Sequence, residues 1–267
     1  YNGVAGLSSQ IPTVVAIYGR PDQTRSDWFT ATCTVNCNPG TENTQLNCVT
    51  GPGYGANHIW DIKVTTTANS PEIEGEAISE LSSQSTSYAT PTIFGIAVHS
   101  SISNFNKDTI PTSGEHKLVL TGTDMGPTGT KLEGYYGPSG VGYCAKNCVV
   151  TTANVKVECT TIEGIGQAHT WRLDIRSHEW HGRPSISVST SYAAPTVTDV
   201  AIGSLTAGSN VMSTWGDETI VVEGTNFGPL FDAKSICTPP NPGQILLEWS
   251  NHDDETCTTN NNCYSYK

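Results

Sequence analysis

The stretch Cys144-Ala-Lys-Asn-Cys148, followed by Cys159 and by Gly164-Ile-Gly166-Gln-Ala-His169-Thr-Trp171-Arg-Leu173-Asp-Ile175, occurs twice in this chain. The earlier copy reads Cys33-Thr-Val-Asn-Cys37, then Cys48, then Gly53-Tyr-Gly55-Ala-Asn-His58-Ile-Trp60-Asp-Ile62. Each matched residue of the second copy lies 111 positions after its partner, as Trp171 lies after Trp60. This constant displacement indicates two copies of one structural pattern, so we predict a tandem array.

Length and composition favour small β-rich units. The chain has 267 residues, and the repeat divides it into units of roughly 100 residues, each large enough for its own core. Only 14% of the residues are charged, while Thr, Ser, Asn and Gly are abundant, a composition that suits short strands joined by turns. We therefore expect an all-β protein.

Alternation of apolar and polar residues predicts individual strands. In the first copy they cover Thr13–Tyr18, Trp28–Val35, Gln45–Thr50 and His58–Val64. In the last of these, Trp60 falls on the apolar face, so we expect Trp60 and its counterpart Trp171 to be core residues.

Charge and hydrophobicity argue against two classes of partner, nucleic acids and membranes. Net charge is −12, and no cluster of Lys and Arg is present along which a phosphate backbone could lie, so we expect no nucleic acid. No apolar run approaches the roughly 18 residues of a membrane helix, so we expect no membrane contact within this segment. Because the chain begins at Tyr1 without an initiator Met, we expect a processed product or part of a longer protein.

A second repeat marks the joints between units. Ser87-Tyr88-Ala-Thr-Pro91 recurs as Ser191-Tyr192-Ala-Ala-Pro195. Proline fixes its own φ and restricts the residue before it, so these joints should hold neighbouring units semi-rigidly. We therefore predict three units, at residues 1–90, 91–194 and 195–267.

Further motifs resemble a known family. Gly122-Thr-Asp-Met-Gly-Pro127 recurs as Gly224-Thr-Asn-Phe-Gly-Pro229, and Tyr136-Gly-Pro138 precedes the Cys hairpin and the Gly-x-Gly strand. In this order the motifs resemble the IPT/TIG domain, an immunoglobulin-like β-sandwich of plexins, large extracellular repeat proteins and some transcription factors. The resemblance implies disulfides Cys148–Cys159 and, by the same reading, Cys37–Cys48.

Laid over one another, the units differ in completeness. The middle unit, 91–194, has every strand motif, the first lacks counterparts of the two initial strands, and the last has those two but lacks the Gly-x-Gly strand. A half sandwich leaves an apolar face and strand edges in water. Either the chain is a segment of a longer array, or the last unit of one copy completes the first unit of the next by strand addition, which would build a filament.

Nine cysteines bear on the compartment and on further bridges. Their spacing fits disulfides better than a zinc site, so we expect an oxidising, extracellular or cell-surface location. The two implied bridges leave an odd number of cysteines, so at least one thiol is free or has a partner outside the chain. The remaining cysteines are Cys33, Cys144, Cys237, Cys257 and Cys263. We favour a local Cys257–Cys263 bridge over a bond from Cys263 to a neighbouring copy.

Candidate sites are weak. We interpret His178 and His181 as surface-loop residues, not a metal pair, and Asp253–Glu255 as a solvated acidic turn, not a calcium site. No catalytic motif is present, so we expect neither enzyme activity nor a cofactor. Segments rich in Ser and Thr near Pro, such as Ser82–Pro91, are candidates for O-linked glycans or bare loops.

These observations predict a non-enzymatic extracellular structural protein: tandem immunoglobulin-like sandwiches, one complete unit flanked by two partial ones, joined head to tail with copies of itself. The alternative is an adhesive or ligand-binding ectodomain, part of a longer cell-surface protein.

Overall fold

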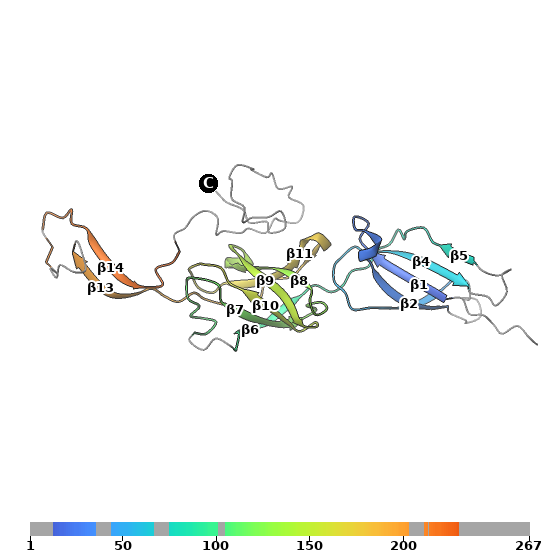
Figure 1. The fold of residues 1–267 in the computed structure, drawn as a ribbon, viewed down its shortest axis with the longest axis horizontal. Coiled ribbons are helices and arrows are strands. Elements are labelled where there is room, and N and C mark those ends of the chain that lie inside the picture. Colours follow the sequence, from blue (N-terminus) through green and yellow to red (C-terminus); the bar gives the residue numbers. More distant parts are fainter. Residues whose placement is uncertain are drawn as a thin grey trace, which may run out of the picture. The chain divides into compact units, whose positions relative to one another are not determined.

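A computed structural model describes residues 13–35, 44–66, 75–100, 105–202, 211, 212 and 214–229. In this part of the chain every regular element longer than a single helical turn is a strand, and three antiparallel sheets form (Figure 1). None of the described helical turns has the length or apolar character to cross a membrane. The contacts divide the chain into two compact units, the first of residues 1–90 with 176–180, the second of 91–175 with 181–267.

The first unit contains a five-stranded sheet of order β3-β2-β1-β4-β5. Its strands are β1 (Thr13–Gly19), β2 (Phe29–Val35), β3 (Leu46–Thr50), β4 (Ile59–Thr66) and β5 (Gly75–Ile78). Apolar residues alternate along β1, so Val14, Ala16 and Tyr18 share one buried face with Ala31 and Cys33 of β2.

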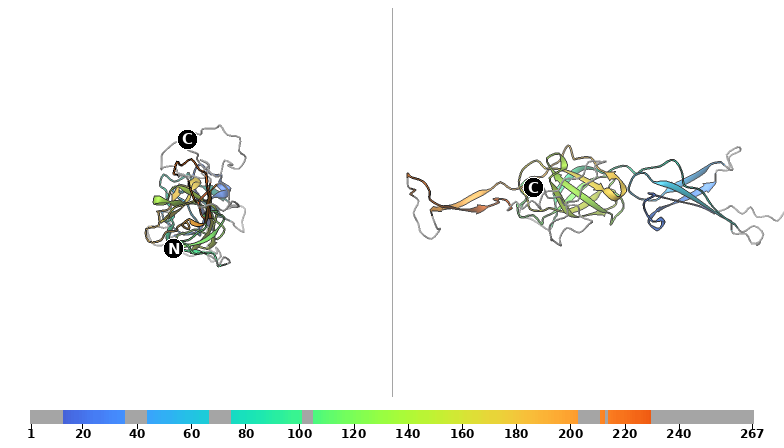
Figure 2. Two further views of the ribbon diagram at one scale, coloured as in Figure 1. Left: turned by 90° about the vertical axis from the view of Figure 1, so that its left-hand side faces the viewer. Right: turned by 90° about the horizontal axis from the view of Figure 1, so that it is seen from above.

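The second sheet has seven strands and curls into a half-barrel (Figure 2). Its order is β12-β11-β8-β9-β10-β7-β6. The strands are β6 (Thr92–Val98), β7 (Lys117–Thr123), β8 (Lys131–Gly137), β9 (Tyr143–Thr152), β10 (Lys156–Thr160), β11 (Thr170–Ile175) and β12 (Trp180–His181). Leu118, Leu120, Val157 and Trp171 are fully buried and form the centre of its core.

The third sheet is a pair of strands, β13 (Thr196–Ile202) and β14 (Ile220–Thr225), drawn in orange in Figure 1. It repeats the β6–β7 pair in register: Val200 lies opposite Val222, as Ile96 lies opposite Leu120. Both strand pairs have a register shift at the second residue of the first strand, after Ile93 in β6 and after Val197 in β13. The β13–β14 pair is therefore a structural copy of β6–β7.

The first sheet copies the other half of the seven-stranded sheet. Its order β3-β2-β1-β4 reproduces β10-β9-β8-β11. Tyr18 lies opposite Phe29 across β1 and β2, as Tyr136 lies opposite Tyr143 across β8 and β9. The connection between the paired strands is longer in the first unit, where it covers residues 20–28, than in the second, where it covers 138–142.

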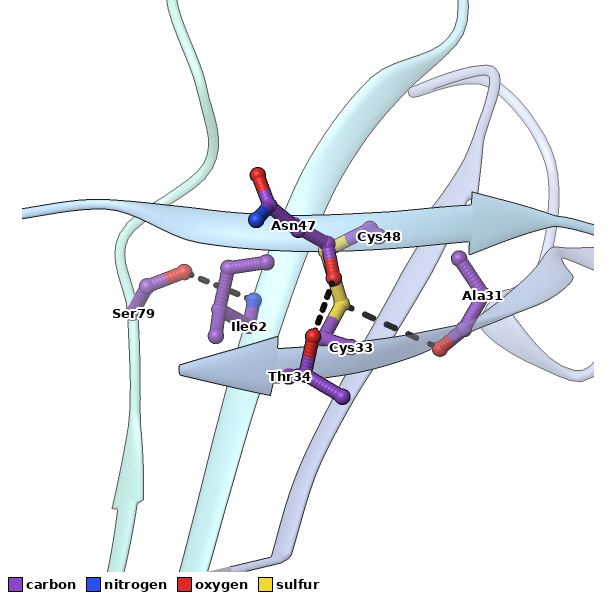
Figure 3. The surroundings of a disulfide bond; sticks show 7 residues. All are labelled: Ala31, Cys33, Thr34, Asn47, Cys48, Ile62 and Ser79. Atoms are coloured by element: carbon purple, nitrogen blue, oxygen red, sulfur yellow. Dashed lines mark hydrogen bonds between the residues drawn. A yellow bond between two sulfur atoms is a disulfide. The ribbon is translucent and has the colours of Figure 1, made fainter. Parts of the chain in front are cut away.

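The structure corrects one of the two disulfide predictions. Cys148 bonds to Cys159, the pair that the family resemblance implied, but Cys48 bonds to Cys33, so the Cys37–Cys48 bridge is wrong (Figure 3). Cys33 lies opposite Val14 as Cys148 lies opposite Leu132, so Cys33 is the structural counterpart of Cys148. The bonded cysteines are 15 residues apart in the first unit and 11 in the second, so the displacement of 111 that matches Cys48 to Cys159 matched Cys148 to the wrong cysteine.

Five of the nine cysteines lie in the described residues. Cys33 and Cys48 are directly opposite in register across β2 and β3, with Cα atoms 4.0 Å apart. Cys144 lies on β9. The remaining four, and with them the predicted Cys257–Cys263 bridge, lie outside the described residues: Cys37, Cys237, Cys257 and Cys263. The two disulfides indicate an oxidising compartment.

Candidate functional site

The predicted joint tyrosines are anchored by paired hydroxyl groups. Tyr192 is 3% exposed, and its hydroxyl lies 2.7 Å from that of Tyr136 and donates to the carbonyl of Ile162 at 2.6 Å. In the first unit the hydroxyls of Tyr88 and Tyr18 are 2.5 Å apart. Burial raises the pKa of both joint tyrosines well above the usual phenol range, so both stay neutral. Pro91 and Pro195 follow these anchored residues by three positions.

The Gly-x-Gly motif exists because of these tyrosines. A Cβ on Gly164 would lie 2.6 Å from the ring of Tyr192, and a Cβ on Gly53 would lie equally close to Tyr88. Only glycine permits that approach. The second glycine of the motif, Gly166, has φ +102°, a left-handed conformation that glycine adopts without strain.

The histidine of the motif closes the same loop. Nε2 of His169 lies 3.0 Å from the carbonyl oxygen of Ile165, and His58 repeats the contact with Tyr54 at 3.1 Å. Both rings are buried, and Nδ1 of each has no hydrogen-bond partner among the described residues. Burial lowers the pKa of both imidazoles, so both are neutral near pH 7.

Hydroxyl groups before the first joint have structural partners. Ser82 Oγ accepts from the backbone N–H of Trp60 and Thr86 Oγ1 from its indole N–H, while Ser87 Oγ accepts from the N–H of Asn57. The corresponding residues of the second unit are Ser185, Thr190 and Ser191. These oxygens therefore fix the loop before the joint to the start of β4.

The first sheet is poorly covered on its apolar face. Trp171 is fully buried as expected, but Trp60 stacks on Tyr18 and is only half-buried. The same holds along the whole face, where the half-buried residues are Phe29, Leu46, Cys48, Trp60, Ile62, Val64 and Tyr88. Their counterparts are at most 8% exposed: Tyr143, Val157, Cys159, Trp171, Leu173, Ile175 and Tyr192. The difference lies in neighbouring strands, because the five-stranded sheet has no equivalent of β6 and β7 among the described residues.

The β13–β14 pair lacks the other part of the sheet, because the described residues contain no strands that cover its apolar face. Its apolar side chains are exposed where those of β6–β7 are buried: Val222 is 46% exposed and its counterpart Leu120 is 0% exposed. The other exposed members are Val197, Val200, Ile220 and Phe227, and their buried counterparts are Ile93, Ile96, Leu118 and Met125. In the described residues neither β13 nor β14 pairs with a further strand.

The candidate metal ligands do not converge. Nε2 of His178 lies 2.7 Å from the amide nitrogen of Gln23, whereas Nδ1 of His181 lies 3.4 Å from Oδ2 of Asp174. In the ranges that the structure covers, no group of three His, Cys, Asp or Glu side chains could hold a metal ion. Asp253–Glu255 lies outside those ranges.

Asp174 is a buried carboxylate that no sequence motif singled out. It is 1% exposed, and it bonds Arg172 Nη2 at 2.8 Å and the N–H of Gly182 at 3.1 Å. Burial raises its pKa. Because each oxygen has a donor, we assign Asp174 a structural role at the end of β11.

The two incompletely covered surfaces, the β3 edge with its apolar face and the β14 edge with its apolar face, are therefore the candidate functional site. No protein-family model, curated protein or solved structure matches this chain.

Proposed function

We propose that this chain is a non-enzymatic, extracellular structural protein of tandem immunoglobulin-like units resembling IPT/TIG domains, and that its copies join head to tail. The observation that carries this proposal is the reciprocal exposure of two sheets that are copies of the two halves of the seven-stranded sheet. Each has what the other lacks, so β13–β14 of one copy completes the β1–β5 sheet of the next.

The seven-stranded sheet supplies the register of this join. There β7 pairs antiparallel with β10, with Leu120 opposite Val157 and Thr121 opposite Lys156. Transferred to the exposed strands, this register places Val222 opposite Leu46 and Glu223 opposite Gln45. The backbone groups along both edges would then gain hydrogen-bond partners, as in other cases of strand addition.

Apolar burial favours the join. Fully burying a Val, Ile or Phe side chain contributes about 1.5–3 kcal/mol, and the five side chains of β13–β14 are roughly half exposed before it. The half-buried apolar residues of the β1–β5 sheet would also lose exposed surface in the join. Together these contributions are of the size needed to offset the several kcal/mol that association costs in lost freedom.

Because the β3 surface and the β14 surface differ, each copy can bind one neighbour at its β3 edge and another at its β14 edge. A contact of this kind either closes into a ring or continues as a filament. The disulfides and the anchored joint tyrosines suit such a load-bearing role outside the cell.

A cysteine pair tests the join. Gln45→Cys and Glu223→Cys in one chain should give a ladder of disulfide-linked oligomers on a non-reducing gel. Pairing Gln45→Cys with Asp199→Cys is the control, because Asp199 lies on β13, one strand further from β3. A link confined to single chains, or monodisperse monomer in light scattering, would overturn head-to-tail assembly and favour the ligand-binding ectodomain.

A charge placed in the interface gives a second test. Val222→Lys should abolish oligomers and filaments in negative stain, because the ammonium group would be buried in the completed core. Ile186→Lys is the matched control, since Ile186 is fully exposed on the second unit. Equal assembly of both variants would contradict the proposal.

A further inference from the structure

The loop before β14 repeats the backbone of the loop before β7. The offset that matches β14 to β7 also matches Gly216 to Gly114 and Asp217 to Glu115. Both glycines have a left-handed φ, of +78° and +70°, and the two acidic residues follow with φ of 64° and 60°. Because a left-handed φ is uncommon for residues other than glycine, the agreement at Asp217 and Glu115 indicates one conformation in both loops.

The two loops differ in exposure. Ile110 is 2% exposed in the second unit, whereas its counterpart Met212 is 58% exposed. Gly114 is likewise buried, and Gly216 is exposed. A Cβ on Gly114 would lie 2.4 Å from the backbone of Ile162, whereas a Cβ on Gly216 would meet no described atom within 4 Å. The loop before β14 thus has the conformation of a docked loop while these residues are open to solvent.

Backbone hydrogen bonds hold the loop of the second unit on its joint. The N–H of Ile110 donates to the carbonyl of Ser191 at 3.0 Å, and the N–H of Ala193 donates to the carbonyl of Ile110 at 2.7 Å. These bonds form a parallel bridge between Ile110 and the joint tyrosine. The N–H of Gly164 donates to the carbonyl of Thr112 at 3.1 Å. The loop is therefore fixed by donors from the joint and from the Gly-x-Gly motif.

The first unit contains the residues that correspond to the receiving side. Tyr88 donates its N–H to the carbonyl of Gly55 at 2.9 Å, as the joint tyrosine of the second unit donates to Gly166 at 2.9 Å. Among the described residues none forms a bridge with Tyr88, and the N–H groups of Gly53 and Ala89, which correspond to the two donors, have no hydrogen-bond partner. These two donors and the half-buried tyrosine are therefore available to a partner.

We propose that Met212 and residues 214–217, here named the docking loop, dock on Tyr88 of a second copy of the chain. The inference rests on the proposed head-to-tail join, which brings β14 of one copy to β3 of the next. The strand register of that join extends into the docking loop, so the contacts of the second unit can be transferred. Met212 then takes the place of Ile110 and forms the bridge with Tyr88.

The transferred contacts specify two hydrogen bonds between copies. The N–H of Ala89 donates to the carbonyl of Met212, and the N–H of Gly53 donates to the carbonyl of Thr214. The neighbouring copy is then held by the β3 edge and also by the segment that leads into the first joint.

Amide hydrogen exchange of the whole protein tests these bonds. The N–H of Ala89 should exchange at least about tenfold more slowly in the disulfide-linked ladder of the Gln45→Cys, Glu223→Cys chain than in the Val222→Lys monomer, because a hydrogen-bonded amide exchanges only on opening. The N–H of Tyr88 is the internal control and should be protected in both states, since its acceptor belongs to the same unit.

Two exposed apolar side chains of the docking loop give a second test. Met212→Ser should weaken assembly at least about tenfold, because Met212 takes a buried position. Trp215→Ser is the matched control: Trp215 is 93% exposed, but its counterpart Ser113 is exposed in the second unit, so assembly should be unchanged. Non-specific apolar association predicts the reverse order, so a larger loss for Trp215→Ser would overturn the proposal.

A pair of glycine variants tests the close approach of the docking loop. Gly216→Ala should weaken assembly, because its Cβ would meet the backbone of the receiving segment as a Cβ on Gly114 would meet that of Ile162. Gly129→Ala is the matched control, since Gly129 has φ +87° and no described atom near its Cβ. Equal assembly of the two variants would contradict the docking.

The ladder separates failure of this contact from failure of the join. If the Gln45→Cys, Glu223→Cys ladder forms but the exchange rate of the Ala89 N–H is unchanged, the docking of the loop is wrong and the join stands. If no ladder forms, both are wrong.

Discussion

The hydroxyl groups of Tyr136 and Tyr192 lie 2.7 Å apart and share the backbone of Ile162, whose N–H donates to Tyr136 and whose carbonyl accepts from Tyr192. The pair ties β8 to the end of the unit, directly before Pro195. The joint therefore begins from a fixed point in the core, because neither ring can move without losing buried hydrogen bonds.

Removing one hydroxyl of this pair should destabilise the second unit. Tyr192→Phe leaves the carbonyl of Ile162 and the hydroxyl of Tyr136 each with one partner fewer, which should cost about 1–3 kcal/mol in urea unfolding. Tyr88→Phe should cost less, because Tyr88 is only half-buried. Equal losses in the two variants would show that burial does not set the strength of the pair.

The glycine of the motif should not tolerate a methyl group. Gly164→Ala would place Cβ 2.6 Å from the Tyr192 ring, which is fixed by its hydrogen bonds. We expect a loss of about 1–3 kcal/mol from this overpacking, measured by thermal unfolding. Gly51→Ala is the matched control, because its Cβ would meet only the carbonyl oxygen of Thr30 at 3.6 Å. A melting temperature of Gly164→Ala equal to that of the control would contradict the steric account.

Disulfide mapping should distinguish the two candidate partners of Cys48. Proteolysis without reduction should yield a linked peptide pair containing Cys33 and Cys48. Cys37→Ser should leave this pair intact, whereas Cys33→Ser should abolish it and lower stability by about 2–4 kcal/mol. Recovery of a Cys37–Cys48 pair from the native protein would refute the pairing of Cys33 with Cys48 across β2 and β3.

Acid should weaken the protein through the motif histidines. Burial lowers the pKa of His58 and of His169 below the ordinary value near 6.5, so below that pH the unfolded chain binds more protons than the folded one. Their contribution to stability is complete above pH 6.5 and is lost as the pH falls. The rings of Tyr136 and Tyr192 beside His169 provide no countercharge, because burial raises the pKa of both phenols.

Proton NMR of the histidine rings checks this directly. Both buried imidazoles should titrate below 6.5, and the urea midpoint should be lower at pH 5 than at pH 7.5. A His169 pKa at or above 6.5 would contradict the assignment of its ring as neutral and desolvated.

Much of the fold could be predicted from the sequence because strand alternation is a local signal. The predicted stretches Thr13–Tyr18 and Gln45–Thr50 agree with β1 and β3 to within one residue. The partner of Cys48 could not be predicted, because the bonded cysteines are 15 residues apart in the first unit and 11 in the second, so one constant displacement cannot match both pairs. Similarly, the partial exposure of Trp60 depends on which strands pack over its face of the sheet. The alternation of apolar and polar residues along β4 does not reveal those strands.

The candidate site was only partly accessible to sequence reasoning. The missing strand motifs indicated which sheets lack a covering layer, and the exposure of Val222 agrees with that expectation. The extent to which each side chain is exposed could not be predicted in this way, because it depends on which strands pack on the face and not on the local pattern.

The Cys33–Cys48 bond has a consequence for how the β3 edge meets a partner. It ties the outermost strand of the sheet to its inner neighbour, so the bond restricts the conformations open to the β3 edge. A pre-ordered edge loses less chain entropy when it is paired than a fraying one does. In the proposed join, reduction of this single cross-strand bond would therefore raise the entropy cost of pairing the β3 edge, apart from any effect on unfolding.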